Sequence, residues 1–148
     1  MTEAQNSLRD RVLHSDDDLR DMLDLLLQKA ARRQVWVLFL DERGCLGDPL
    51  LPIADYPGDP HGAVDDEHSG AVTQAHLLMH RIGMMREISG NAHVVLAWER
   101  RGGDAAKAAD AAWARAMADA AALLDVPLRA QFIVHSRGVR PLHADDYV

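Results

Sequence analysis

The fold of this chain is decided by the stretch VWVLFLDERG at residues 35–44. Its first six residues are all apolar and rich in β-branched and aromatic side chains, and a polar turn ending in Gly44 follows them. A continuous run of this kind is typical of a strand that is buried on both faces. We therefore expect a strand over Val35–Leu40, and a weaker strand from Cys45-Leu46 and Leu50–Ile53 that pairs with it as a hairpin.

Two further segments toward the C-terminus predict strands. His93–Trp98 is a second buried apolar run, and Leu128–Val134 is a third. The turn at Ser136-Arg137-Gly138 returns Val139–Leu142 as a hairpin partner for the last of them. Between the first two buried runs, residues 47–70 carry four prolines among Gly, Asp and His, which favours a long loop or an edge strand.

Three helices are predicted from apolar spacing and from capping residues. The first begins after Ser15, whose hydroxyl and Asp18 form a capping box. The second runs from about Ser69 to Glu87 and ends at Gly90-Asn91, and the third has Asp104 as its N-cap and continues to Leu124. Helices and strands in this order predict an α/β (α+β) fold with a mixed sheet flanked by helices.

Length and charge limit the function classes. The 148 residues suit one folding unit, in which a helical segment over 1–33 packs on a domain formed by 34–148. Sixteen Lys and Arg residues against 23 Asp and Glu residues give a formal net charge of −7, which disfavours nucleic acid and anionic membranes as partners. A single cysteine, Cys45, and no signal-like or membrane-spanning segment predict a cytoplasmic protein.

Two local patterns contain residues that could bind a ligand, one a metal ion and the other an anion. His76 and His80 have the i, i+4 spacing of zinc ligands, but Leu77 stands where a zincin has its general base. The turn Arg100-Arg101-Gly102-Gly103 lies between a strand and a helix N-terminus, where backbone N–H groups and the helix dipole attract anions. Glu99 and Asp104 make the local charge mixed, so a surface turn closed by ion pairs is the competing interpretation.

The same region carries a family resemblance. Val94-Val95-Leu96-Ala97 leading into a Gly-containing turn, a helix from Asp104 to Leu124, and Asp125–Val134 resemble the C-terminal half of a RadC-type JAB/MPN (JAMM) domain. Val37–Gly44 resembles that family's first buried strand and turn, so the resemblance covers roughly residues 34–142. It implies a JAB/MPN-like, cytidine-deaminase-like three-layer arrangement.

Most of the family's metal-binding residues are replaced in this chain. Its His-x-His pair corresponds here to Trp98 and Arg100, and its ligand Asp to Asp110. Arg33 or Gln34 stands in place of the Glu that activates water, and Ala130-Gln131 replaces the Asp-His pair common in the RadC group. Because catalysis by zinc needs about three protein ligands and an open position, the hydrolysis implied by the family should be absent.

We therefore expect a catalytically inactive RadC/JAB-like domain, a pseudoenzyme that acts as a binding or regulatory module and has no metal and no cofactor. Its ligand groove would lie at the former metal site, with Trp98 as a stacking platform and Arg100 as a planar donor fork. The partner would be a protein, a peptide or a small anionic ligand. The candidate ligand-binding residues are Trp98, Glu99, Arg100, Arg101, Asp104 and Asp110.

Two other functions remain open at this stage. A metal-dependent hydrolase could use relocated ligands from His68, His76 and His80. A DNA-repair-associated protein could use Arg32, Arg33, Arg100 and Arg101 as one basic patch. A homodimer is also expected if the second helix exposes its apolar residues Leu77, Leu78 and Met84.

Overall fold

A computed structural model of the chain describes residues 9–147. The first eight residues of the predicted N-terminal segment 1–33 lie outside the described residues. Within that range the elements are, in chain order, α2 (Asp16–Leu27), β1 (Gln34–Leu40), β2 (Leu46–Ala54), β3 (Ala63–Asp66), β4 (Gly70–Thr73), α3 (Gln74–Ser89), β5 (His93–Glu99), α4 (Ala108–Leu123), β6 (Leu128–His135), β7 (Gly138–Leu142) and a short 3₁₀ helix, η1 (Ala144–Asp146).

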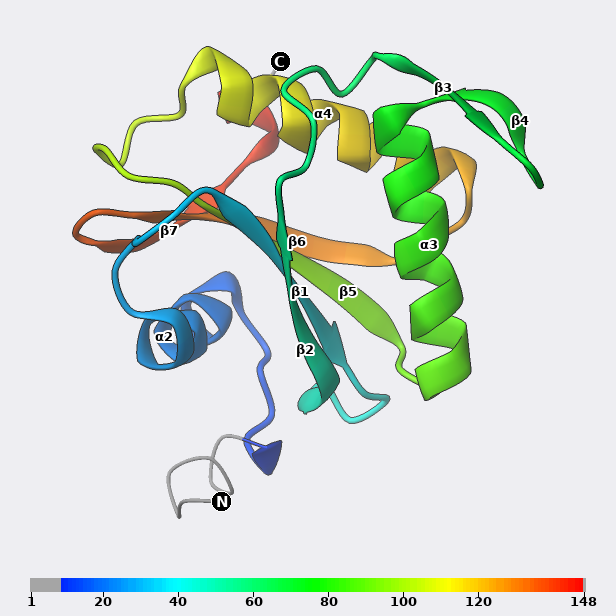
Figure 1. Cartoon of the computed structure of the whole chain (residues 1–148). Coiled ribbons are helices and arrows are strands. Elements are labelled where there is room, and N and C mark those ends of the chain that lie inside the picture. Colours follow the sequence, from blue (N-terminus) through cyan, green and yellow to red (C-terminus); the bar gives the residue numbers. More distant parts are fainter. Residues whose placement is uncertain (1–8, 148) are drawn as a thin grey trace.

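Five of the strands form one mixed sheet in the order β2-β1-β5-β6-β7 (Figure 1). β5 and β6 run parallel because α4 connects them, and the other neighbours are antiparallel. β1 and β5, which contain the two apolar runs, are adjacent in the interior of the sheet. The predicted mixed sheet flanked by helices is confirmed.

The helices cover both faces of the sheet (Figure 1). On one face, α2 packs against a cluster that includes Leu38, Val95 and Phe132. On the other, α3 and α4 pack against a cluster that includes Val37 and Trp98. Successive residues of β5 therefore point alternately to α2 and to the α3–α4 layer, and this alternation separates Trp98 from Glu99.

The segment over residues 47–70 contains an edge strand, and the hairpin predicted between Val35–Leu40 and Leu50–Ile53 is confirmed. β2 continues through Pro49 and Pro52 to Ala54, and β3 and β4 form a separate hairpin. Proline removes a backbone donor, but an edge strand such as β2 tolerates this because one of its sides has no neighbour in the sheet. β4 also takes the first residues predicted for the second helix, so α3 begins at Gln74, after the cap Thr73, and not at Ser69.

Two other helix predictions are resolved by their caps. Ser15 and Asp18 form the predicted capping box of α2, which is confirmed. The N-cap prediction for Asp104 is wrong, because α4 begins at Ala108, its N-cap is Lys107, and the carboxylate that accepts from the Lys107 amide is Asp110. The exposure expected for the apolar residues of α3, on which the homodimer prediction rests, is found only in part. Leu77 is buried, which makes that part of the expectation wrong, whereas Met84 is exposed.

None of the helices within residues 9–147 is long and apolar enough to span a membrane.

Candidate functional site

A half-open cavity of about 220 Å³ lies at the C-terminal end of β5. Its lining comes from the residue before β1, the loop after β2, the end of β5 with the loop that follows, and the first turns of α4. The lining residues are Arg33, Tyr56, Trp98, Arg100, Arg101, Lys107, Ala109, Asp110 and Trp113. The structure thus brings together four of the six predicted site residues, Trp98, Arg100, Arg101 and Asp110.

Three aromatic rings form the floor of this cavity. Tyr56 packs edge-on against Trp98 and Trp113, with centroid distances of 5.4 and 5.3 Å, and the two indoles lie 5.7 Å apart. Trp98 is only 1% exposed, and its Nε1 donates to Oε1 of Gln131 at 2.8 Å. Trp98 is therefore part of the core with one edge at the cavity, which corrects its prediction as an open stacking platform.

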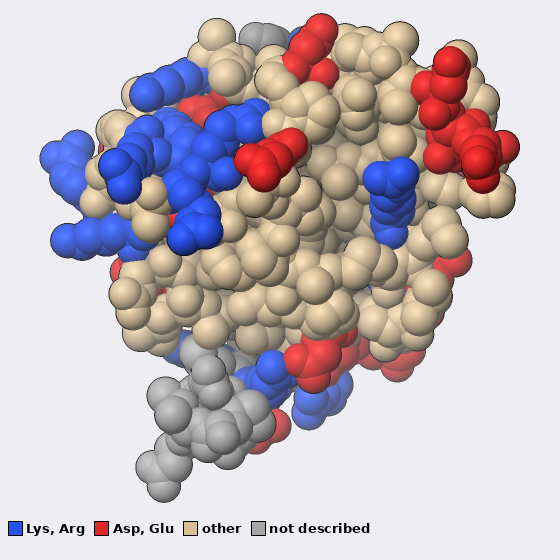
Figure 2. Space-filling model, viewed as in Figure 1, with Lys and Arg blue, Asp and Glu red and all other residues tan. Residues whose placement is uncertain are grey.

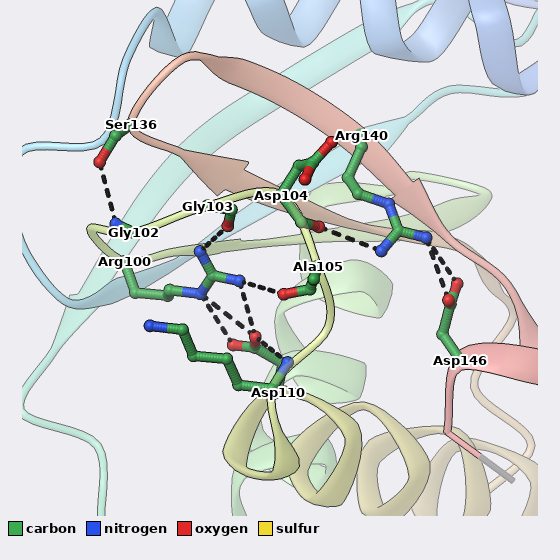
Figure 3. Close-up of polar contacts among 10 residues, drawn as sticks. Arg100, Gly102, Gly103, Asp104, Ala105, Asp110, Ser136, Arg140 and Asp146 are labelled. Carbon is green, nitrogen blue, oxygen red and sulfur yellow. Dashed lines mark hydrogen bonds and ion pairs between the residues drawn. The ribbon is translucent and has the colours of Figure 1, made fainter.

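Most donors of the Arg100 guanidinium are used by contacts inside the protein (Figure 3). Nε and Nη2 donate to Oδ2 of Asp110 at 3.1 and 2.9 Å. Nη1 donates to the carbonyl of Gly103, and Nη2 also donates to the carbonyl of Ala105. The planar fork predicted for ligand binding is therefore used to shape the loop between β5 and α4.

A second arginine holds the same loop from the other side. Nη1 of Arg140 donates to the carbonyl of Asp104 at 3.1 Å, and its Nη2 pairs with both carboxylate oxygens of Asp146 (Figure 3). Three consecutive carbonyls, of residues 103–105, therefore accept hydrogen bonds from guanidinium groups. The Asp104 side chain itself is exposed and does not line the cavity, so its predicted role in the groove is not supported.

The start of this loop requires glycine. Gly102 has a φ of +120°, and a Cβ there would stand 2.8 Å from Nζ of Lys107. Its N–H donates to Oγ of Ser136, and its carbonyl accepts from the Ser136 amide. The loop is thus fastened to the turn between β6 and β7, and Lys107 lies back across it.

Three cations at the cavity have no ionic partner within the described range. Nη1 and Nη2 of Arg33 donate to the carbonyls of Tyr56 and Pro57, and its guanidinium lies 3.6 Å from the centre of the Tyr56 ring. Nε of Arg101 donates to the carbonyl of Ala31. Among residues 9–147, no carboxylate oxygen lies within 4.0 Å of the charged nitrogens of Arg33, Arg101 or Lys107.

These cations make the cavity mouth basic on an acidic protein. The one carboxylate in the lining, Asp110, is already paired with Arg100. In Figure 2, Lys and Arg side chains gather at the upper left, over the part of the molecule where Figure 1 shows the loop after β5 and the β6–β7 hairpin. Uncompensated positive charge concentrated in a concave site attracts small anions even when the net charge is negative.

Glu99 lies on the opposite face of the sheet from the cavity. Its carboxylate accepts from the amides of Ala31 and Arg32 at 2.8 and 3.0 Å, from Gln34 Nε2, and from Trp36 Nε1. Burial acts to raise the pKa of Glu99, but these four hydrogen bonds together hold that pKa below its ordinary value. Glu99 therefore joins the α2–β1 connection to β5, and the prediction that it binds ligand in the groove is not supported.

The histidines proposed as relocated metal ligands do not line one common cavity. His76 lines one cavity beside α4, His80 lines another, and His68 lies in the turn between β3 and β4. Residues 9–147 include no group of three or more His, Cys, Asp or Glu side chains placed to hold a metal ion.

Five lining residues were not predicted as ligand-binding: Arg33, Tyr56, Lys107, Ala109 and Trp113. Arg33 was predicted only as a replacement for the family's Glu and as part of the alternative basic patch. Tyr56 gave no signal, because it lies in a proline-rich segment whose path across the end of β5 depends on the sheet order.

No protein-family model matches this chain, and no curated protein is significantly similar to it.

Proposed function

We propose that this chain is a RadC-related, JAB/MPN-like domain without a metal centre, which acts as a binding or regulatory module and takes an anionic ligand in the cavity at the end of β5. The observation that carries the proposal is the Arg100–Asp110 ion pair. It puts a fixed cation and its carboxylate partner at the place where the resemblance expects a metal ion and its Asp ligand.

The clustering of the corresponding positions supports the relationship. Trp98, Arg100 and Asp110, which the resemblance matches to three metal ligands, all line one cavity. Arg33, one of the two residues that stand in place of the catalytic Glu, lines the same cavity from the position before β1, whereas the other, Gln34, donates to Glu99 on the opposite face of the sheet. The meeting of positions that are distant in the sequence supports the proposed relationship. The sheet with α2 on one face and α3 and α4 on the other is compatible with the three-layer arrangement that the resemblance implies.

The side chains in the cavity do not fit a zinc ion. Zinc needs three or four thiolate, imidazole or carboxylate donors, and this lining has one carboxylate, Asp110. Its oxygens already accept from Arg100 and from the amide of Lys107. The guanidinium of Arg100 would also repel a cation. We therefore derive no metal-assisted step at this site.

A small anion suits the cavity better than a nucleic acid strand. Single-stranded nucleic acid is held by exposed aromatic faces along a basic groove, whereas Trp98 and Trp113 are 1% and 2% exposed. Arg101 and Lys107 are exposed and carry donors that no described carboxylate uses. A phosphate or carboxylate group placed between them would gain charge-assisted hydrogen bonds.

The proposal is tested by titrating ¹⁵N-labelled full-length protein with sodium phosphate at low ionic strength. We expect saturable amide shifts concentrated at residues 100–107. The double variant Arg101→Gln/Lys107→Gln should weaken binding at least fivefold, whereas Arg81→Gln, an exposed cation outside the cavity lining, should not. Absent or unlocalised shifts would overturn the proposal, as would stoichiometric zinc or manganese in elemental analysis of untagged protein.

A further inference from the structure

We infer that the ligand of this cavity is a small organic anion with a compact apolar body of about one ring, and not a bare inorganic anion. This inference rests on the proposed function and specifies the ligand class for the same site. It follows from the contrast between the floor of the cavity and its mouth.

The floor has no free indole donor. Nε1 of Trp98 donates to Gln131, and Nε1 of Trp113 donates to the carbonyls of Pro57 and Gly58 at 3.0 and 3.2 Å. The two indoles are almost fully buried, so the half-buried Tyr56 and the exposed Ala109 supply most of the apolar surface that the aromatic and aliphatic side chains offer to the cavity. A surface of this kind favours an apolar body.

The mouth of the cavity, in contrast, is polar and positively charged. Arg100 faces the cavity, but its guanidinium is occupied by Asp110 and by loop carbonyls. Arg101 and Lys107 are exposed and have no carboxylate partner among residues 9–147. A ligand that contacts both regions must therefore have its negative charge at one end and its apolar part at the other.

The size of the cavity limits the apolar part. Pockets for drug-sized ligands measure about 300–1,000 Å³, and this one is about 220 Å³. One six-membered ring or a short branched chain fits, whereas a fused bicyclic base does not fit beside an anionic group. An inorganic phosphate would use the cations and leave Tyr56 and Ala109 in contact with water.

The test compares three probes by isothermal titration calorimetry with the full chain at pH 8 and low salt. Phenyl phosphate carries both features, inorganic phosphate has the charge alone, and benzyl alcohol has the ring alone. At this pH both phosphates are mainly dianions, so charge is matched. We expect phenyl phosphate to bind at least tenfold more tightly than inorganic phosphate, and benzyl alcohol to give no measurable binding.

Two variants separate the floor from the mouth. Ala109→Leu, at an exposed position in the first turn of α4, fills the cavity without changing any charge. It should weaken phenyl phosphate at least tenfold and inorganic phosphate less than threefold. Arg101→Met/Lys107→Met should weaken both phosphates at least fivefold, and Arg81→Gln should weaken neither.

The possible failures are distinct. Equal affinity for the two phosphates, or an Ala109→Leu variant that binds phenyl phosphate normally, would overturn the ligand class and leave the anion site standing. Benzyl alcohol binding as tightly as phenyl phosphate would overturn it as well, because charge would then play no part. If neither phosphate binds the wild-type protein, the proposed function itself is overturned.

Discussion

Nη2 of Arg100 and Oδ2 of Asp110 lie 2.9 Å apart, and the two side chains are only 11% and 8% exposed. Asp110 belongs to the first turn of α4, and Arg100 follows the last residue of β5. The pair therefore closes the loop between a central strand and a helix. Because both groups are almost removed from water, the attraction between them has to offset the free-energy cost of their desolvation.

Removal of the carboxylate should destabilise the protein strongly. Asp110→Ala leaves the Arg100 charge buried with only carbonyl partners, which typically costs about 3–5 kcal/mol of unfolding free energy. Urea denaturation at pH 7 measures this loss. The matched control is Asp119→Ala, since Asp119 and its partner Arg115 are 75% and 61% exposed, and such a pair contributes less than about 1 kcal/mol. A similar loss in both variants would contradict this account of the buried pair.

Replacement of both charges should cost less than removal of one. In Arg100→Met/Asp110→Leu no charge is left unpaired, and apolar replacements of buried ion pairs are often close to neutral. The carbonyls of Gly103 and Ala105 lose their donor, but the exposed loop lets water reach them. Unfolding free energies of the two single variants and the double variant form a thermodynamic cycle. A double variant that is less stable than Asp110→Ala would show that the shape of the guanidinium, and not its charge balance, supports the loop.

Glu99 gives a stability that depends on pH. Because the folded-state pKa is lower than the unfolded-state value, the contribution of the carboxylate is fully present above the unfolded pKa and is lost as the pH falls through the folded pKa. Glu99→Gln should therefore cost about 2 kcal/mol at pH 7, and this difference should shrink below about pH 4. Urea titrations of both proteins at several pH values measure the change.

The control for Glu99 is Glu87→Gln, at an exposed position on α3. That substitution should change stability by less than about 0.5 kcal/mol at pH 7. A constant deficit of Glu99→Gln from pH 7 to pH 3 would mean that side-chain shape, and not the ionised carboxylate, holds the amides of Ala31 and Arg32.

Gln131 connects three elements through its amide group. Oε1 accepts from Trp98 on β5, and Nε2 donates to the carbonyl of Ala114 on α4 at 2.8 Å. Gln131→Leu leaves the buried Trp98 N–H without a partner, which costs about 1–3 kcal/mol. It should also change the tryptophan emission, because the indole loses its acceptor. Thermal unfolding and fluorescence of the variant check both effects, and an unchanged melting temperature would contradict the role of Gln131.

The buried strands could be predicted because their apolar runs are continuous. Val35–Leu40 and His93–Trp98 lie in the interior of the sheet between helices, so nearly every side chain is buried and the sequence pattern is unambiguous. The full extent of β2 was harder to predict, because an edge strand tolerates prolines that would normally indicate a loop. The start of α4 depended on which of two carboxylates, Asp104 or Asp110, accepts from the amide of the N-cap residue, and sequence spacing alone does not decide this.

Only the part of the site that is formed by residues adjacent in the sequence could be predicted. The Arg100-Arg101 turn was visible as a short charged segment, and it does lie at the cavity. Tyr56 and Trp113 are brought to that turn by the sheet order and the packing of α4, which no local pattern contains. Strand alternation could have separated Trp98 from Glu99, since adjacent residues of a strand point to opposite faces.

The loop after β5 has a further consequence for how this protein keeps its shape. The positive groups that hold the carbonyls of residues 103–105 are side chains of the chain itself. They cannot be removed by a chelator, exchanged for another ion, or left out when a cell is short of a trace element. Each newly synthesised copy therefore has the cation that its loop needs as soon as it folds.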